Sequence, residues 1–299
     1  RPGVMERMGL GVDALHALRQ DLVIARISGF GPEGPMSAVR AYDPIVQAEA
    51  GMATWTSDGP ILAPQWMCDK NAGLYAAQAA TAALFARERS GKGAVIDISM
   101  LEAAIAYGWI DLHGDLAFPD SPSRMPDIGS VYRPWATRDG WIVVVMLSQD
   151  EFEGWARAIE ATDLLENPLF ADMTKRFLNW NELRASCAPR IARLTTKEAV
   201  RRLAEEGVPS GVVNRSGSLP DHVQVAHDQF VTVTHHPQAG RVRRTRPVAR
   251  FDGARCELDS HAPRVGEHSH SVLQAVGLSP AEISAAFESG AMHAPGEKN

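Results

Sequence analysis

Asp69 has the position in the sequence that best suits chemistry at a carbonyl group. It stands at the start of a long alanine-rich stretch that ends at Ser90-Gly91, and it follows a loop containing Pro60 and Pro64. A carboxylate at a helix start meets free backbone N–H groups and the positive end of the helix dipole, which hold it ionised. The same groups can stabilise charge that develops on a carbonyl beside it. An ordinary N-cap is the alternative, since Asp is among the preferred residues there.

Other familiar site patterns are not supported by the sequence. Residues 29–34 match the glycine spacing of dinucleotide-binding loops, but Pro32 has no N–H, Glu33 adds negative charge and Pro35 interrupts the expected helix. The histidines show no HExxH spacing and no partnered cysteine pair, so we expect no metal site. No serine lies in a G-x-S-x-G elbow, which leaves a serine hydrolase unsupported.

Composition limits the compartment and the partners. The chain has 299 residues, of which 45% are hydrophobic and 22% charged, as in ordinary globular proteins. Its formal net charge of −6 argues against nucleic acid or an anionic membrane as partner, because both favour a basic surface. The three cysteines form no Cys-x-x-Cys pair, and no uncharged run approaches the roughly 20 residues of a membrane helix. We therefore expect a cytoplasmic protein.

Hydrophobic patterns predict alternating strands and helices in the first 110 residues. Strands are expected at 22–27 and 94–98, and helices at 44–50, from Asp69 to about residue 90, and at 101–112. Such alternation is typical of βαβ units on a parallel sheet. The predicted fold class is therefore α/β.

Two segments rich in turn-forming residues, near 119–126 and 214–222, divide the chain. We predict a large α/β domain built from residues 1–118 and 223–299, with a smaller α+β domain, residues 127–214, inserted between them. The remaining elements expected are a hairpin at Asp139-Gly140, strands at 141–145 and near 230–251, and helices near 149–161, 180–194, 196–206, 268–276 and 280–289.

Eight short stretches, taken in their order and spacing, carry a resemblance: residues 1–10, 27–35, 42–48, 87–93, 97–102, 137–141, 207–211 and 266–269. Together they resemble one family, the class III CoA-transferases, which includes formyl-CoA transferase, carnitine CoA-transferase and alpha-methylacyl-CoA racemase. The resemblance covers essentially the whole chain. It implies a Rossmann-like parallel sheet, an interlocked homodimer, and an N-terminal segment of about 100 residues, with the first strands of the sheet, ahead of Arg1.

The resemblance also implies a reaction. The residue that matches Asp69 is the family's nucleophile, which attacks an acyl-CoA thioester and then carries CoA as an aspartyl-CoA thioester until a carboxylic acid accepts it. The substrates would be an acyl-CoA and a small carboxylic acid. No cofactor would be tightly bound, because coenzyme A enters as part of the substrate.

Five further positions match residues at the family's CoA site. Arg7 corresponds to an arginine that contacts CoA, and Arg40 to a basic residue at the same site, which Ala41 and Tyr42 would line. Asp43 corresponds to an acidic residue close to the catalytic centre. Taken without the resemblance, Arg7 and Arg40 would be surface cations and Tyr42 a core aromatic.

Two other functions remain as alternatives. An alpha-methylacyl-CoA racemase needs two acid–base groups on opposite faces of the substrate, and the family's racemase histidine matches Tyr42. A phenol is a poor base at neutral pH, so transfer is favoured over racemisation. A non-catalytic acyl-CoA-binding fragment is the second alternative. Residues 127–130 lack the glycine-rich loop of formyl-CoA transferases, which argues against formyl or oxalyl specificity.

Overall fold

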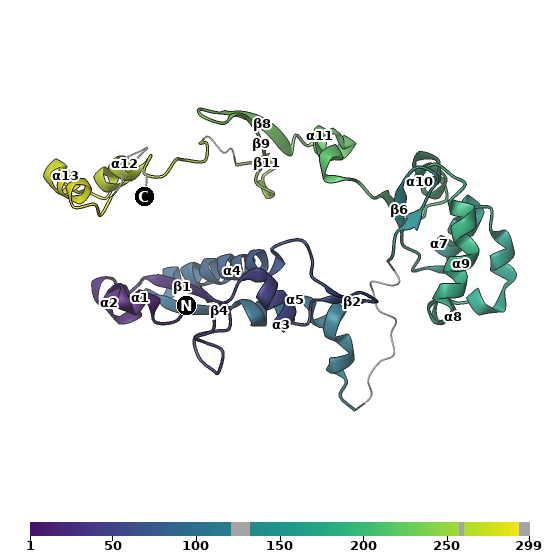
Figure 1. Ribbon diagram of the computed structural model, residues 1–299, viewed down its shortest axis with the longest axis horizontal. Helices are drawn as coiled ribbons and strands as arrows, with labels where there is room; N and C mark the ends of the chain where they lie inside the picture. Colours follow the sequence, from purple (N-terminus) through teal and green to yellow (C-terminus); the bar gives the residue numbers. More distant parts are fainter. Residues whose placement is uncertain (121–131, 257–259, 293–299) are drawn as a thin grey trace. The chain divides into compact units, whose positions relative to one another are not determined.

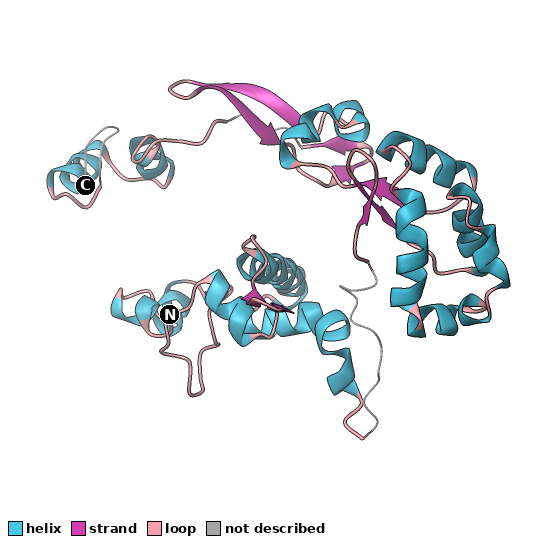
Figure 2. Ribbon diagram, turned by 45° about the vertical axis from the view of Figure 1, so that its right-hand side comes forward, coloured by secondary structure: helices cyan, strands magenta, loops and turns pink. Residues whose placement is uncertain are grey.

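The computed structural model describes residues 1–120, 132–256 and 260–292 and divides into two compact units (Figure 1). The first contains Arg1–Arg133 and Glu166–Arg184, and the second contains Pro134–Leu165 and Ala185–Asn299. Helices and strands occur in both (Figure 2), which confirms the mixed α/β class. The predicted linker beyond Asp120, the start of the predicted small domain and the loop at 127–130 lie outside the described residues. The predicted domain boundaries stay a prediction.

A parallel strand pair, β1 (Val23–Ser28) with β4 (Ala94–Ser99), forms the sheet of the first unit, with Val23 opposite Ala94 and Ser28 opposite Ser99. The predicted parallel pairing is confirmed. The other elements of this unit are α1 (Val4–Arg7), α2 (Val12–Leu18), α3 (Asp43–Glu49), β2 (Thr54–Thr56), β3 (Gly59–Ile61), α4 (Met67–Ser90), α5 (Met100–His113), η1 (Gly114–Ala117), η3 (Pro168–Phe170), α8 (Met173–Leu178) and the start of α9 (Trp180–Ile191).

Helix α4 connects the two parallel strands and packs against both of them. Its alanine-rich sequence favours a helix, and Gly91 ends it in the left-handed region at φ 67°, a conformation that suits glycine. Helices α3, α4 and α5 enclose the core of this unit. That core contains Val46, Ala50, Cys68, Ala72, Met100, Ala103 and Ala104.

Small side chains at the contact between α4 and α5 let the two helices approach closely. Ala72 and Ala104 are both buried, and the Asn71 amide, also buried, donates a hydrogen bond of 2.8 Å to the Ala103 carbonyl. This bond satisfies a polar group that burial would otherwise leave without a partner. The bond ties α4 to α5 inside the core of this unit.

The second unit begins with a three-stranded antiparallel sheet, in the order β5 (Trp135–Ala136), β6 (Trp141–Val144) and β7 (Ser210–Val212). The hairpin predicted at Asp139-Gly140 is confirmed. The other elements are α7 (Gln149–Ala158), η2 (Thr162–Glu166), the rest of α9, α10 (Thr196–Glu205), η4 (Ser216–Asp221), α11 (Val223–His227), β8 (Val231–His236), β9 (Gly240–Thr245), β10 (Arg250–Phe251), β11 (Ala254–Arg255), α12 (Ser269–Ala275) and α13 (Pro280–Glu288).

Aromatic side chains form the core between this sheet and α7. The rings of Trp135 and Trp155 lie 5.1 Å apart and both residues are fully buried, with Phe152 beside Trp155 on the buried face of α7. The indole N–H of Trp155 donates to the Cys187 sulfur at 3.4 Å. A buried tryptophan needs such a partner for its polar atom.

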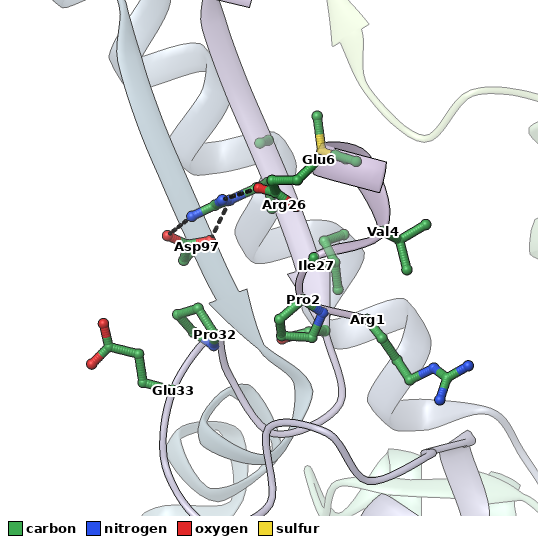
Figure 3. Close-up of a pocket in the computed structure, with 13 residues that line it drawn as sticks. Arg1, Pro2, Val4, Glu6, Arg26, Ile27, Pro32, Glu33 and Asp97 are labelled. Carbon is green, nitrogen blue, oxygen red and sulfur yellow. Dashed lines mark hydrogen bonds and ion pairs between the residues drawn. The ribbon is translucent and has the colours of Figure 1, made fainter. Parts of the chain in front are cut away.

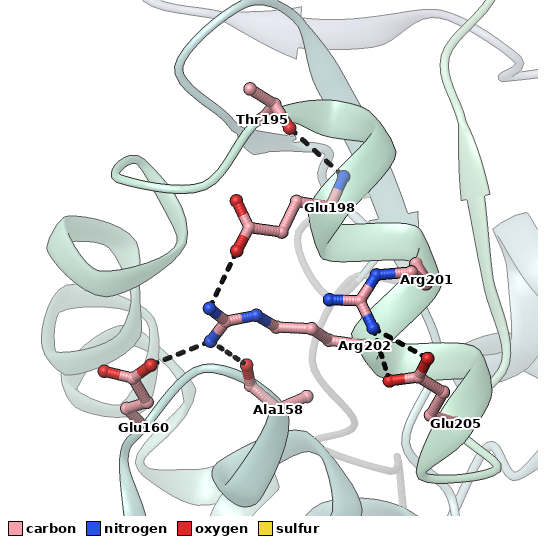
Figure 4. A network of polar contacts seen from close by, with 7 residues as sticks. All are labelled: Ala158, Glu160, Thr195, Glu198, Arg201, Arg202 and Glu205. Carbon is pink, nitrogen blue, oxygen red and sulfur yellow. Dashed lines mark hydrogen bonds and ion pairs between the residues drawn. The ribbon is translucent and has the colours of Figure 1, made fainter.

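Ion pairs on the surface of α10 hold it to the turn after α7 (Figure 4). Arg202 contacts Glu160 at 2.8 Å and Glu198 at 2.7 Å, while Arg201 pairs with Glu205 one turn further on. Exposed pairs of this kind contribute little each, about 0–1 kcal/mol. We regard this cluster as structural.

Candidate active site

The predicted helix at Asp69 is confirmed, but it begins earlier than expected. Trp66 is the N-cap residue of α4 and contributes no capping hydrogen bond from its side chain, so Asp69 is the third helical residue. The N-cap interpretation of Asp69 is therefore wrong. The reason is that the turn Gln65–Met67, closed by a 3.0 Å bond between the Met67 N–H and the Gln65 carbonyl, starts the helix two residues ahead of Asp69.

The carboxylate and the backbone N–H of Asp69 have different surroundings. The N–H donates to Oδ2 of Asp43 at 3.0 Å. The expectation of a free N–H group at Asp69 is therefore wrong. The side chain is exposed, and within residues 1–120, 132–256 and 260–292 its carboxylate makes no hydrogen bond or ion pair. Asp43 thus satisfies the amide of Asp69 and leaves the carboxylate of Asp69 available.

Asp43 is the first residue of α3 and is only 2% exposed. Its two oxygens accept hydrogen bonds from two neutral donors, the Asp69 N–H at 3.0 Å and the Gln47 side-chain amide at 2.6 Å. The starts of α3 and α4 both face this carboxylate, and the positive ends of helix dipoles favour a negative charge there. One buried carboxylate therefore joins the N-termini of the two helices.

Cys68 lies beside this pair of aspartates and is 1% exposed. Burial, followed by the negative charges of Asp43 and Asp69, raises the pKa of the Cys68 thiol to about 11. Its S–H contacts the Met52 sulfur at 3.8 Å. The thiol is consequently neutral at physiological pH and a weak nucleophile.

The structure places the other predicted site residues around α3 and α1. Tyr42 is the residue before α3 and is 74% exposed, so the core-aromatic alternative is wrong. Arg40 is exposed, and Ala41 is half-buried against Gly29, where a Cβ atom would collide with that of Ala41. Backbone continuity and the Asp43 contact bring Arg40, Ala41 and Tyr42 to the side of α3 that holds the start of α4.

Arg7 ends the short helix α1 and is exposed. Its guanidinium lies close to Gly3, where an added Cβ atom would sit 3.2 Å from Nη1 of Arg7. The φ of Gly3, 76°, is a backbone conformation that suits glycine. The described part of the chain shows no contact between Arg7 and Asp69. Any joint role of the two is therefore a proposal.

A cavity of about 500 Å³ opens beside α1 and the ends of the parallel strands (Figure 3). Its lining includes Arg1, Pro32 and Glu33, and Arg26 crosses it between Glu6 and Asp97. Arg26 forms two bonds with Asp97, at 2.7 and 2.8 Å, so this guanidinium is already neutralised. Asp69 does not line the cavity.

Sequence reasoning missed Gln47, which is the third member of the buried network. The side chain is 1% exposed and lies one helical turn after Asp43. Two polar residues four positions apart, flanked by the buried Val46 and Ala50, were the available signal, because residues at i and i+4 share a helix face. The other partners of Gln47 lie in the loop before α4 and that of Asp43 lies in α4 itself, and no local pattern identifies them.

In the described part of the chain, no group of three or more His, Cys, Asp or Glu side chains is arranged to hold a metal ion. No helix among those same residues is long and apolar enough to cross a bilayer.

Comparison with known proteins identifies the family. The model of CoA-transferase family III matches residues 1–269. A probable fatty acyl-CoA transferase of Mycobacterium tuberculosis is 30% identical over 90% of this chain and 72% of its own length. The crystal structure of that protein superposes with a TM-score of 0.80 at 29% identity, covering 93% of this chain and 75% of the other.

Two further relatives are enzymes by name. An acyl-CoA transferase of Fusarium pseudograminearum is 28% identical over 97% of this chain, and the mouse succinyl-CoA:glutarate CoA-transferase is 27% identical over 92%. The chain spans 65% and 64% of the lengths of these two relatives. Both the family model and the structural match extend over most of the sequence, and on that basis the chain belongs to CoA-transferase family III.

Proposed function

We propose that the protein transfers coenzyme A from an acyl-CoA to a small carboxylic acid, with Asp69 as the nucleophile. The observation that carries the proposal is the state of Asp69: its carboxylate is exposed and without a partner in the described residues, while its backbone N–H is bound by Asp43. A carboxylate at the start of a 24-residue helix also meets a positive dipole. Family membership and the names of the relatives support transfer as the reaction class.

The reaction begins with the donor thioester. A carboxylate oxygen of Asp69 attacks the thioester carbonyl and the C–S bond breaks. CoA leaves as a thiolate, and a mixed anhydride between Asp69 and the donor acid remains. The thiolate then attacks the aspartyl carbonyl of that anhydride, which releases the donor acid and forms an aspartyl-CoA thioester. Dividing the exchange in this way replaces one difficult step with easier covalent ones.

The second half of the reaction mirrors the first. The acceptor carboxylate attacks the aspartyl thioester and displaces the CoA thiolate, forming a new anhydride with Asp69. The thiolate then attacks the acceptor carbonyl, which gives the new acyl-CoA and frees the Asp69 carboxylate. In each half of the reaction the displaced CoA thiolate is the next nucleophile, and the donor acid leaves before the acceptor acid attacks, so no oxidant, metal or bound cofactor enters the balance.

The remaining predicted residues would bind coenzyme A. The exposed guanidinium groups of Arg7 and Arg40 suit phosphate, which arginine contacts through several N–H donors. Tyr42 offers an exposed ring next to Asp43, and Ala41 a small surface between them and Arg40. The names of the relatives include fatty acyl, succinyl and glutarate groups, so we propose a range of acyl donors and no single one.

Mass spectrometry of the protein incubated with acetyl-CoA or succinyl-CoA tests the nucleophile. Trypsin would release residues 41–70 as one peptide, and it contains Asp43, Cys68 and Asp69. We expect a CoA adduct on Asp69. Hydroxylamine should cleave it, releasing CoA and leaving an aspartyl hydroxamate on the peptide. A reductant-sensitive adduct on Cys68, or an adduct on Asp43, would contradict the proposal, and fragmentation of the peptide distinguishes the three sites.

The racemase alternative predicts a different outcome. Proton removal and return would place solvent deuterium at the carbon next to the thioester, without a CoA adduct. A non-catalytic binding protein would bind acyl-CoA equally well with Asp69→Asn and would form no adduct in either form.

We also propose that the enzyme is a cytoplasmic homodimer. Large apolar side chains stay exposed along α5 and η1, where Tyr107, Ile110, Leu116 and Phe118 are 60–76% exposed. A patch of this kind marks an interaction surface, because water disfavours it. Light scattering on the purified protein should give twice the chain mass, and a monomer would contradict this assignment.

A further inference from the structure

The side chain of Gln47 joins three segments around the start of α4. Its Nε2 donates to Oδ1 of Asp43 at 2.6 Å and to the Gln65 carbonyl at 2.8 Å, and its Oε1 accepts the Ala63 N–H at 3.0 Å. The side chain is 1% exposed, so each of these bonds replaces one to water. A single buried amide therefore holds both the carboxylate that caps α4 and the loop that leads into it.

This arrangement fixes the direction in which α4 starts. The helix has no capping bond from Trp66, and the Asp69 N–H is satisfied instead by Oδ2 of Asp43. Because Gln47 holds the other oxygen, the Asp43 carboxylate cannot rotate without losing one of its two bonds. The position of the Asp69 backbone thus depends on Gln47 through Asp43.

The charge of the buried Asp43 carboxylate makes its bond from Gln47 costly to lose. Asp43 is 2% exposed, and among the described residues no cation pairs with it. Loss of the Gln47 donor would leave a buried carboxylate oxygen without a hydrogen bond, which is costly, so the group would turn toward another donor or toward water. Either movement removes the acceptor from the Asp69 N–H.

We infer that Gln47 is a positioning residue for the nucleophile Asp69, an inference that rests on the proposed function. It does not contact substrate. It sets the orientation of Asp43, and Asp43 sets the start of α4, so that the Asp69 carboxylate points out of the helix toward the acyl-CoA. Nucleophilic attack requires accurate placement, and a displacement of about 1 Å can cost about 100-fold in rate.

The test compares Gln47→Met with Asn71→Leu. Both replacements are close in shape to the residue removed and delete a buried amide, but among the described residues the amide of Asn71 bonds only to the Ala103 carbonyl. With succinyl-CoA as the probe, Gln47→Met should form the Asp69 adduct about 10- to 100-fold more slowly at an unchanged half-saturating concentration. Asn71→Leu should keep the wild-type rate, although its melting temperature should fall by about as much as that of Gln47→Met.

A second variant, Gln47→Glu, gives a readout that a purely structural role would not produce. The protonated form of the new carboxyl group restores an O–H donor to Asp43, whereas its ionised form faces Asp43 as a like charge. The adduct rate relative to wild type should therefore rise as the pH is lowered from 8 to 5. Asn71→Asp, the matched control, should show a flat ratio.

Separate outcomes test the inference and the function beneath it. If wild type forms the adduct, Asp69→Asn does not, and both Gln47 variants match wild type at every pH, the positioning role is wrong and the nucleophile stands. If wild type itself forms no adduct on Asp69 with either acyl-CoA, the proposed function fails first. Equal slowing of the Gln47 and Asn71 variants would reduce Gln47 to a stabilising residue and overturn the inference.

Discussion

The third residue of α4 and the third residue of α7 are both acidic, but their carboxylates have opposite surroundings. At α7, Ser148 caps the helix and Glu151 reaches back to the N–H groups of Ser148 and Leu147, at 2.9 and 2.7 Å. At α4, Trp66 provides no cap, and the Asp69 carboxylate has no partner in the described residues. The same helical position therefore holds a structural carboxylate in one unit and a free one in the other.

The origin of the cap explains the difference. Helix α7 is capped by its own sequence, in a capping box that consumes the third side chain. Helix α4 is capped from 26 residues away, because Asp43 accepts the Asp69 N–H. A cap supplied by another helix satisfies the backbone and leaves the local carboxylate for chemistry.

Exchanging each acid for its amide should show the difference between the two carboxylates most clearly. Asp69→Asn removes the nucleophile, so we expect CoA transfer to fall by at least about 1,000-fold with little change in melting temperature. Glu151→Gln should leave transfer unchanged and lower the melting temperature only slightly, since a glutamine there can still accept the capping-box hydrogen bonds and only the charge is lost. Steady-state transfer assays and thermal unfolding of both variants measure the two effects.

A reversed pattern, with activity lost at Glu151 and kept at Asp69, would show that a free carboxylate at this helical position is not the feature that matters. Circular dichroism of Asp69→Asn is the control for folding.

Thiol reactivity sharpens the same comparison at the neighbouring residue. Burial, then the charges of Asp43 and Asp69, raise the pKa of Cys68 to about 11, and burial raises that of Cys187 to about 11 as well, whereas Cys256 is exposed. With an aromatic disulfide reagent at pH 8, we expect one fast thiol and two that react at least about 100-fold more slowly in the native protein.

Asp69→Asn removes one of the two negative charges beside Cys68, so its thiol should then react slightly faster, while Cys187 stays unchanged. Fast modification of Cys68 in the wild-type protein would mean that the start of α4 is not packed against α3. Denaturant, which exposes all three thiols, provides the reference rate.

Removing the distant cap should have a smaller effect than removing the nucleophile. Asp43→Ala leaves the Asp69 N–H without its acceptor and removes one of the acceptors of the Gln47 amide, which we expect to cost about 1–3 kcal/mol of stability and to slow transfer. Ser148→Ala removes the local cap of α7 and should cost about 1 kcal/mol without changing transfer. Urea unfolding of the two variants, with transfer assays beside it, measures the contrast.

If Asp43→Ala were as stable as wild type, the cap from α3 would be a geometric coincidence. Asp43→Asn keeps one acceptor oxygen for the Asp69 N–H and should fall between wild type and Asp43→Ala in both measurements.

Local patterns predicted the elements of the site well. The alanine-rich run with its glycine stop gave α4, the apolar runs gave β1 and β4, and their alternation gave the parallel pairing. Each of these features depends on a few neighbouring residues. The strand predicted at 22–27 is present as Val23–Ser28, although Ile27 within it is 48% exposed.

Features that depend on distant residues could not be predicted from the sequence. The hairpin of β2 and β3 and the short strand β7 carry no alternating pattern long enough to identify them. Gln47 gains its role from partners 16 and 18 residues away. Asp69 could be singled out as a candidate nucleophile, but not as the third residue of a helix capped by Asp43, because that cap exists only after α3 and α4 have packed.

A third carboxylate, Glu267, extends the comparison to pH. The N–H of Arg264, then the side chain of His261, hold the pKa of Glu267 at about 2, down from 4.5. Because the folded-state pKa is depressed, its contribution to stability is present above about pH 4.5 and is lost as the pH falls toward 2. We expect an NMR titration to show the Arg264 amide shifting as Glu267 takes up its proton, which in the folded protein occurs near pH 2, and Glu267→Gln to abolish the shift. The effect should stay local, since this exposed turn belongs to neither helix start, and a wholesale loss of folded signal in the same window would contradict it.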